Sequence, residues 1–334
     1  MIVIGMLSVS SYLGLCLFLC WSSSSHDVLV TALSSSTTTT TTTSLDISKI
    51  RAISFDVTGT LLVTKEPVIK SYHDAAIWAQ LPILPTHDDF QSGFGAAFRE
   101  RCIESPCFGG VEGISGREWW IVTVRRVLDF ALLKNSEHNT NNNDERRHYY
   151  TEQEFQRYFR RVYQHFGSPA GYMVLEDAAS LLSTIEIAAA SSSKELVLGI
   201  TSNTPIRHME SILPMLDNLH TKFSWFTCSQ EVGHEKPAGE IFEDAYRQAK
   251  FWLDDPTLKK EEILHIGDSY TCDYCGAKAY GFQALLLDRS DHPSVTAYQD
   301  WLKAPDYEGK SLEDVERNTI TSLEEVASLL MLSN

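Results

Sequence analysis

The sequence has few basic residues: 28 lysines and arginines stand against 44 aspartates and glutamates, a formal net charge of −16 over 334 residues. A surface of this sign disfavours nucleic acids and anionic membranes as partners, and it suits a protein that binds cations. Cysteines are also few, and the seven present are scattered along the chain. An odd, scattered set argues against a disulfide scaffold and favours a reducing compartment.

Charge is absent from residues 1–21. This length suits a signal-peptide core or a single membrane span, but a basic segment before it is missing. Residues 22–44 are dominated by serine and threonine, a composition that cannot bury enough apolar surface to fold. The leader is therefore expected to be a cleaved targeting segment, an uncleaved anchor or the product of a mispredicted start codon. Any membrane contact is expected through this segment alone, and a cytoplasmic or nuclear location is the alternative for the folded domain.

After residue 46, short apolar runs alternate with longer amphipathic stretches, which is typical of a parallel sheet covered by helices. The expected strands are residues 50–55, 196–200, 223–227, 263–266 and 284–287. Polar residues directly follow four of these five runs. Because the carboxyl ends of parallel strands form the binding crevice of such a sheet, we expect these polar residues to converge.

Helical periodicity fills the stretch between the first two expected strands and predicts an inserted helical domain. Ser115-Gly-Arg-Glu118 has the pattern of a capping box and should begin one helix. Residues 151–166 should form another, whose aromatic residues recur at helical spacing and therefore face a core. The predicted organisation is a leader and linker at 1–45, an α/β core at 46–70 and 188–334, and a helical insertion at 71–187.

The segment Asp56-Val-Thr-Gly-Thr60 follows the first expected strand and presents a carboxylate at its end. Asp56 is the candidate nucleophile for phosphoryl transfer, because a carboxylate held there allows in-line approach of a phosphorus atom. Gly59 lets the chain turn, and Thr60 can hydrogen-bond within the loop or bind phosphate. Ser202 and Asn203, behind the second expected strand, can offer a hydroxyl and a backbone N–H to a phosphoryl oxygen.

Three charged residues complete the candidate site. Lys236 would neutralise the nucleophile and the charge that develops during transfer, and it would also bind phosphate. The segment Gly267-Asp-Ser-Tyr-Thr-Cys-Asp273 places Asp268 and Asp273 behind another strand. Two acids beside Asp56 make a natural Mg²⁺ site. His265 lies inside the apolar strand and is expected to be a core histidine rather than a catalyst.

These four segments resemble, in order and spacing, the four motifs of the haloacid dehalogenase superfamily. Within it, the chain resembles the REG-2-like group, through Arg117-Glu-Trp-Trp120, Val174-Leu-Glu-Asp177, Glu231-Val-Gly233 before Lys236-Pro237, and His265-Ile-Gly-Asp-Ser-Tyr-Thr-Cys-Asp-Tyr274. The resemblance implies a Rossmann-like α/β core with a helical cap of the C1 type inserted after the first motif.

The resemblance also implies roles for individual residues. Asp56 would be phosphorylated, and Ser202 would bind the phosphoryl group. The backbone carbonyl of Thr58 and the carboxylate of Asp268 would ligate Mg²⁺ together with Asp56. Asp273 would hold Lys236 or a metal-bound water. The candidate metal ligands are therefore Asp56, Thr58, Asp268 and Asp273.

Thr58 departs from the pattern of most phosphatases in this superfamily, which have a second aspartate there. A threonine hydroxyl does not titrate near neutral pH, so a general acid–base contribution of ~10²–10⁴-fold should be missing or supplied elsewhere. We therefore expect a slow Mg²⁺-dependent phosphomonoesterase that acts on a small phosphorylated metabolite through an aspartyl-phosphate at Asp56. The alternatives are a catalytically weak or idle binding or scaffold protein and, less favoured, a metal-free 2-haloacid dehalogenase.

Overall fold

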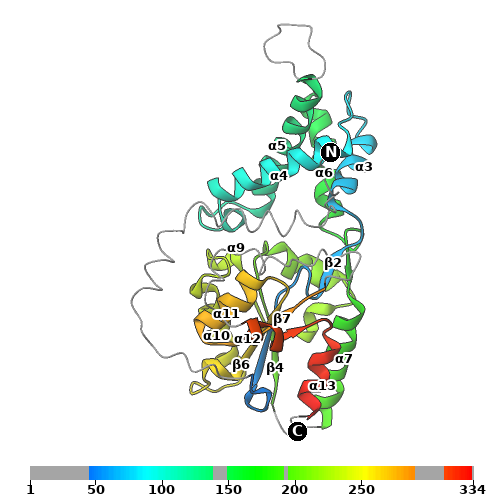
Figure 1. Cartoon of the computed structure of the whole chain (residues 1–334). Coiled ribbons are helices and arrows are strands. Elements are labelled where there is room, and N and C mark those ends of the chain that lie inside the picture. The colour runs from blue at the N-terminus through cyan, green and yellow to red at the C-terminus, as the bar shows by residue number, and fades with distance from the viewer. Residues whose placement is uncertain (1–44, 138–148, 192–194, 290–311, 333–334) are drawn as a thin grey trace, which may run out of the picture. The chain divides into compact units, whose positions relative to one another are not determined.

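The computed structural model describes residues 45–137, 149–191, 195–289 and 312–332 (Figure 1). The chain divides into a helical unit, Thr64–Tyr172, and a core unit built from the described parts of Thr37–Val63 and Met173–Asn334. The leader and most of the linker predicted at 1–45 lie outside the described residues. Within the described ranges, no helix is both long and apolar enough to cross a membrane.

The core unit is built on a six-stranded sheet with the strand order β5-β4-β1-β6-β7-β8. All neighbouring pairs are parallel, which confirms the predicted α/β fold class. The strands are β1 (Ala52–Phe55), β4 (Val197–Ser202), β5 (Trp225–Cys228), β6 (Ile263–Gly267), β7 (Gln283–Leu287) and β8 (Thr319–Ile320). The first five overlap the predicted strands, because a parallel strand buried on both faces reads as a continuous apolar run. The two-residue strand β8 was not predicted.

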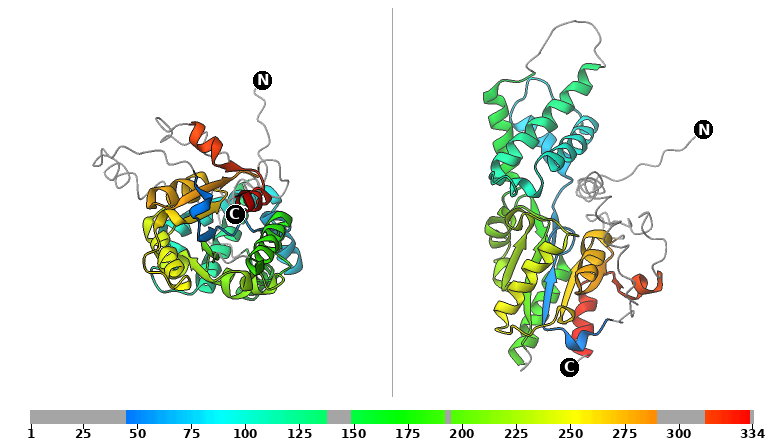
Figure 2. Two further views of the ribbon diagram at one scale, coloured as in Figure 1. Left: turned by 90° about the horizontal axis from the view of Figure 1, so that it is seen from below. Right: turned by 90° about the vertical axis from the view of Figure 1, so that its left-hand side faces the viewer.

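Helices cover both faces of this sheet (Figures 1 and 2). One face carries α10 (Gly239–Trp252) and α11 (Gly276–Tyr280), and the other carries α7 (Glu176–Ser191) and α13 (Glu324–Leu332). The short helices α8 (Leu213–Met215), α9 (Ser229–Val232) and α12 (Leu312–Arg317) complete the unit. Between α10 and the sheet, Trp225, Ile241 and Phe242 are fully buried in one apolar cluster. The sheet is therefore a rigid base that fixes the residues at its strand ends.

The helical unit contains α3 (Val68–Trp78), α4 (His87–Glu104), α5 (Gly116–Glu137) and α6 (Glu152–His165). The predicted capping box at the start of α5 is present: the Glu118 N–H donates to Ser115 Oγ at 3.2 Å, and the Ser115 N–H donates to Glu118 Oε2 at 2.9 Å. Phe155, Tyr158 and Phe159 of α6 lie fully buried in the aromatic core of this unit. The predicted core role of these aromatic residues is thus observed.

The helical unit ends at Tyr172 rather than at the predicted residue 187. Helix α7 has the expected periodicity, but it contacts α13 and belongs to the core unit. Near its start, Asp177 accepts a hydrogen bond from the Leu323 N–H at 2.8 Å. The boundaries between the units fall in β2 (Leu62–Thr64) and β3 (Tyr172–Val174), which pair as a two-stranded sheet.

Candidate active site

Asp56 lies at the carboxyl end of the central strand β1 and is 8% exposed. In the register of the sheet, Phe55 pairs with Ile200 of β4 on one side and Ile266 of β6 on the other. Strand β4 then ends at Ser202, and β6 ends directly before Asp268. The parallel topology therefore brings together the polar residues that follow these strands, as the sequence predicted.

Lys236 is the positive centre of the site and is 3% exposed. Its Nζ donates to Asp56 Oδ1 at 2.6 Å, to Asp273 Oδ1 at 2.5 Å and to the Thr201 carbonyl at 2.8 Å. Burial alone would lower the pKa of Lys236, but the carboxylates of Asp273 and Asp56 raise it above the usual range. The lysine is therefore charged and fully engaged.

Asn203 holds the backbone of this lysine. Its Oδ1 accepts the Lys236 N–H at 2.7 Å, and its Nδ2 donates to the Lys236 carbonyl at 3.0 Å. The side chain of Asn203 thus positions Lys236, and the phosphate-binding role predicted for Asn203 rests on its backbone N–H. The Ser202 side chain lies close enough to Asp56 to oppose the rise that burial causes in the pKa of its carboxyl group, so Ser202 lies beside the candidate nucleophile.

Asp273 has partners on both carboxylate oxygens. Oδ1 accepts from Lys236 and lies 3.0 Å from His265 Nε2, while Oδ2 accepts the Ser269 N–H at 2.9 Å. Burial alone would raise its pKa, but Lys236 and His265 hold the pKa of Asp273 below its usual range. A Cβ at Gly267 would lie 2.2 Å from Asp273 Cγ, so glycine is needed for this close approach. Asp273 is therefore an ionised and firmly oriented group.

His265 is a fully buried core residue, as expected, and it also supports the site. Its Nδ1 lies 3.0 Å from Ser54 Oγ, which in turn lies 2.7 Å from Thr201 Oγ1. Burial lowers the pKa of His265 and favours the neutral ring. A neutral ring that donates from Nε2 to the Asp273 carboxylate satisfies both groups.

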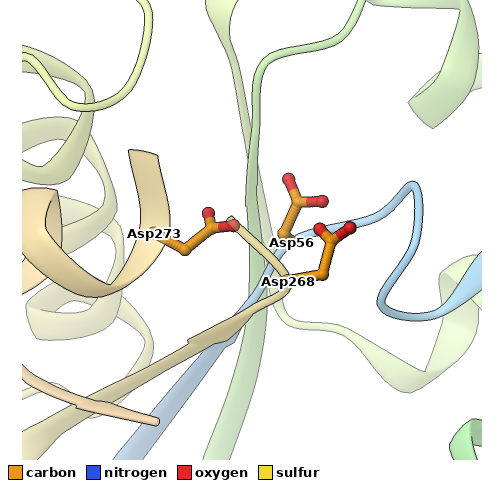
Figure 3. A group of neighbouring side chains, drawn as sticks. All are labelled: Asp56, Asp268 and Asp273. Carbon is orange, nitrogen blue, oxygen red and sulfur yellow. The ribbon is translucent and has the colours of Figure 1, made fainter. Parts of the chain in front are cut away.

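The carboxylates of Asp56, Asp268 and Asp273 lie together, with one oxygen of each within 4.8 Å of the others (Figure 3). Lys236 is paired with two of them. Burial and the charges of Asp56 and Asp273 raise the pKa of Asp268 well above its usual range. Burial likewise raises the pKa of Asp56 despite the neighbouring lysine. Three carboxylates against one ammonium group leave an excess of negative charge that a cation would neutralise.

A divalent cation with a preference for oxygen ligands fits this donor set, and Mg²⁺ is such an ion. Because both oxygens of Asp273 have protein donors, the carboxylates that could hold the ion directly are those of Asp56 and Asp268. The carboxylate of Asp268 packs against Gly59, where a Cβ would lie 2.2 Å from Asp268 Oδ2. Gly59 also has φ +89°, a conformation that favours glycine.

The loop after Asp56 differs from the expectation at Thr60. The Thr60 Oγ1 is buried, and no hydrogen-bond partner for it is found in the described part of the chain. The side chain of Thr60 therefore does not stabilise the loop by hydrogen bonding. Thr58 is partly exposed and forms an isolated bridge with Leu62. The Gly59 N–H donates to the Leu62 carbonyl at 2.8 Å, which closes the turn.

Arg289 is a residue of the site that the sequence prediction missed. Its buried guanidinium donates to the carbonyls of Gly59 and Thr60 and pairs with Asp177. Two signals could have drawn attention to it. Arg289 follows the last apolar run of the sheet, and Asp177 belongs to a segment with family resemblance. Neither signal identifies the backbone carbonyls as partners.

A family model described as haloacid dehalogenase-like hydrolase matches residues 50–281, and the chain belongs to this family of hydrolases. It is similar to human haloacid dehalogenase-like hydrolase domain-containing protein 3, with 27% identity over 72% of this chain and 82% of the human protein. The rhythmically expressed gene 2 protein of Drosophila melanogaster is 25% identical over 74% of this chain and 86% of the fly protein. The fold also matches the crystal structure of 2-haloacid dehalogenase from Pseudomonas syringae pv. Tomato, with a TM-score of 0.50 and 20% sequence identity. The match covers 85% of this chain and 100% of the bacterial chain.

Proposed function

We propose that this hydrolase is a Mg²⁺-dependent phosphomonoesterase of low turnover that forms a phosphoryl-enzyme at Asp56. The observation that carries the proposal is the arrangement around Asp56. Its carboxylate stands at the end of the central strand, with Oδ1 held by Lys236 Nζ at 2.6 Å and an oxygen of Asp268 within 4.8 Å. A carboxylate held between a lysine and a cation site can approach a phosphorus atom without repulsion between anions.

In the first step, a carboxylate oxygen of Asp56 forms a bond to phosphorus while the ester P–O bond breaks. Ser202 and the backbone N–H of Asn203 donate hydrogen bonds to the phosphoryl oxygens, and Lys236 holds Asp56 in place. Asp56, Asp268 and the Thr58 carbonyl would hold Mg²⁺, which would supply positive charge to stabilise the phosphoryl group during transfer.

The leaving oxygen requires a proton, and the hydroxyl of Thr58 does not release one near neutral pH. This proton therefore comes from solvent, which slows the first step for alkoxide leaving groups. In the second step, the oxygen of a water molecule bonds to phosphorus, the bond to Asp56 breaks, and a proton of that water passes to solvent. The favoured substrates are small phosphate esters whose leaving groups need little protonation.

The proposal is tested by phosphate release from a panel of phosphomonoesters, with the full chain and the Asp56→Asn variant, each with and without Mg²⁺. We expect turnover that requires both Mg²⁺ and Asp56 and is faster for aryl than for alkyl phosphates. Thr58→Asp should increase the rate with alkyl phosphates towards the ~10²–10⁴-fold range of general acid–base catalysis. Equal rates for the wild type and Asp56→Asn would contradict the proposal. Halide release from 2-haloacids without metal would favour a dehalogenase instead.

A further inference from the structure

Arg289 contacts the loop that follows the candidate nucleophile. Its Nε donates to the Gly59 carbonyl at 3.1 Å, and its Nη2 donates to the Thr60 carbonyl at 3.0 Å. The side chain is 4% exposed, so these hydrogen bonds form away from bulk water. A charged donor in a buried environment makes stronger hydrogen bonds than a neutral one.

The guanidinium is held from its other side by Asp177. Nη2 donates to Asp177 Oδ1 at 2.9 Å, and Nη1 lies 2.8 Å from Oδ2. This carboxylate also accepts the Leu323 N–H at 2.8 Å. The arginine is thus held between the loop and Asp177 of α7, and Asp177 is itself anchored by the backbone of Leu323. Its planar group has a defined orientation, which a single ammonium group cannot reproduce.

The loop held by Arg289 also borders the cation site. Gly59, whose carbonyl accepts from Arg289, is in contact with the carboxylate of Asp268, because a Cβ there would lie 2.2 Å from Oδ2. Thr60 cannot replace this restraint, since its buried hydroxyl has no hydrogen-bond partner among the described residues. A shift of the loop would therefore change the spacing between Asp268 and the backbone at Thr58 and Gly59.

We propose that Arg289, oriented by Asp177, is a positioning residue that fixes the loop at residues 58–60 in the geometry required for Mg²⁺ binding. This inference rests on the proposed function, because it assigns the cation site to the same carboxylates. Arg289 acts through the backbone and does not contact the substrate. Its replacement should weaken Mg²⁺ binding, whereas a purely structural arginine would affect stability alone.

The test is calorimetric titration of Mg²⁺ into the full chain and its variants, together with thermal melting of each protein. Arg289→Lys keeps the charge but cannot reach both carbonyls and Asp177 together, and we expect its Mg²⁺ affinity to fall about tenfold or more. The control is Arg51→Lys, which alters another arginine–aspartate pair of the core unit, with Asp255. The control should bind Mg²⁺ with wild-type affinity. Arg289→Ala should bind more weakly than Arg289→Lys.

Each outcome bears on the inference. Wild-type Mg²⁺ affinity in Arg289→Lys, with or without a lower melting temperature, would overturn the positioning role and leave the proposed function standing. Absence of Mg²⁺ binding in the wild type would overturn both. An equal loss of affinity in Arg51→Lys would also overturn the inference, because it would show a general effect of altering arginine pairs. A loss confined to the Arg289 variants supports it, and Asp177→Asn should then weaken binding in the same direction.

Discussion

Lys236→Met should destabilise the core unit strongly, because the lysine is the partner of two buried carboxylates. The methionine side chain is of similar length and has no charge. It would leave Asp56 Oδ1 and Asp273 Oδ1 without the ammonium group that lies 2.6 and 2.5 Å away. Both carboxylates would remain buried, so this change breaks an ion cluster instead of replacing it with apolar groups.

Removing one partner of a buried ion pair costs ~3–5 kcal/mol, mostly through the charge left unpaired. The Lys236→Met substitution also removes the hydrogen bond from the lysine to the Thr201 carbonyl, which places the expected cost toward the upper end of that range. The pKa of Lys236 is raised in the folded protein, so the stabilisation that the charged lysine provides is present throughout neutral pH. This stabilisation is lost only as the pH rises through the pKa of Lys236 in the folded protein.

Hydrogen exchange of peptides from β1 and β4 measures this effect within the core unit. A loss of 3–5 kcal/mol corresponds to a decrease in protection of roughly 10²- to 10⁴-fold, since every 1.4 kcal/mol is about tenfold. The matched control is Lys222→Met in the same unit, whose ion pair with Glu186 at 2.6 Å is solvent-exposed. Such a pair contributes about 0–1 kcal/mol. A decrease in protection for Lys236→Met no larger than for Lys222→Met would refute the account of the site as a buried charge cluster.

Three further predictions test neighbouring parts of the site. Gly267→Ala should lower the free energy of unfolding, measured in urea, by about 1–3 kcal/mol, because the added Cβ would lie 2.2 Å from Asp273. The control is Gly239→Ala, whose Cβ would lie 3.6 Å from its nearest neighbour and which should not lower the free energy of unfolding in this way. His265→Phe should be less stable in urea than His265→Gln by about 1–3 kcal/mol, because only glutamine can still donate to Asp273. Burial alone would raise the pKa of Asp177, but hydrogen bonds hold this pKa below its usual value. The ionised Asp177 therefore stabilises the folded protein above the unfolded pKa, and this stabilisation is lost as the pH falls. As the pH is lowered below about 5, the free energy of unfolding of Asp177→Asn should therefore decrease less steeply than that of the wild type.

The strands of the core and the convergence of the site could be predicted from the sequence. Each central strand is an apolar run, and the residue directly after it lies at the carboxyl edge of a parallel sheet. The pattern of strands alone therefore predicts that Asp56, Ser202 and Asp268 lie together. Their order along the chain was sufficient, because the topology of a parallel sheet leaves few alternatives.

Features set by tertiary contacts could not be predicted in this way. The periodicity of α7 predicts a helix but does not say which unit it packs against. Arg289 binds carbonyls about 230 residues earlier in the sequence, and backbone carbonyls have no signature in a sequence. The phosphate-binding role predicted for the Asn203 backbone N–H stays a prediction, whereas the pairing of its side-chain amide with the backbone of Lys236 has no local sequence signal. Local patterns thus identify residue types at the site, while the partner of each side chain depends on the fold.

The central claim is that Asp56 forms a covalent bond to phosphorus. Its most direct test is to mix the full chain with a phosphomonoester and Mg²⁺, quench in acid, and reduce with borohydride. The reduction releases phosphate and converts a phosphorylated aspartate to homoserine, which peptide mass spectrometry locates as the label. The account predicts a label on Asp56 that requires Mg²⁺ and is absent in Asp56→Asn. Turnover of the same ester without a label at Asp56, or with the label on another residue, would contradict it.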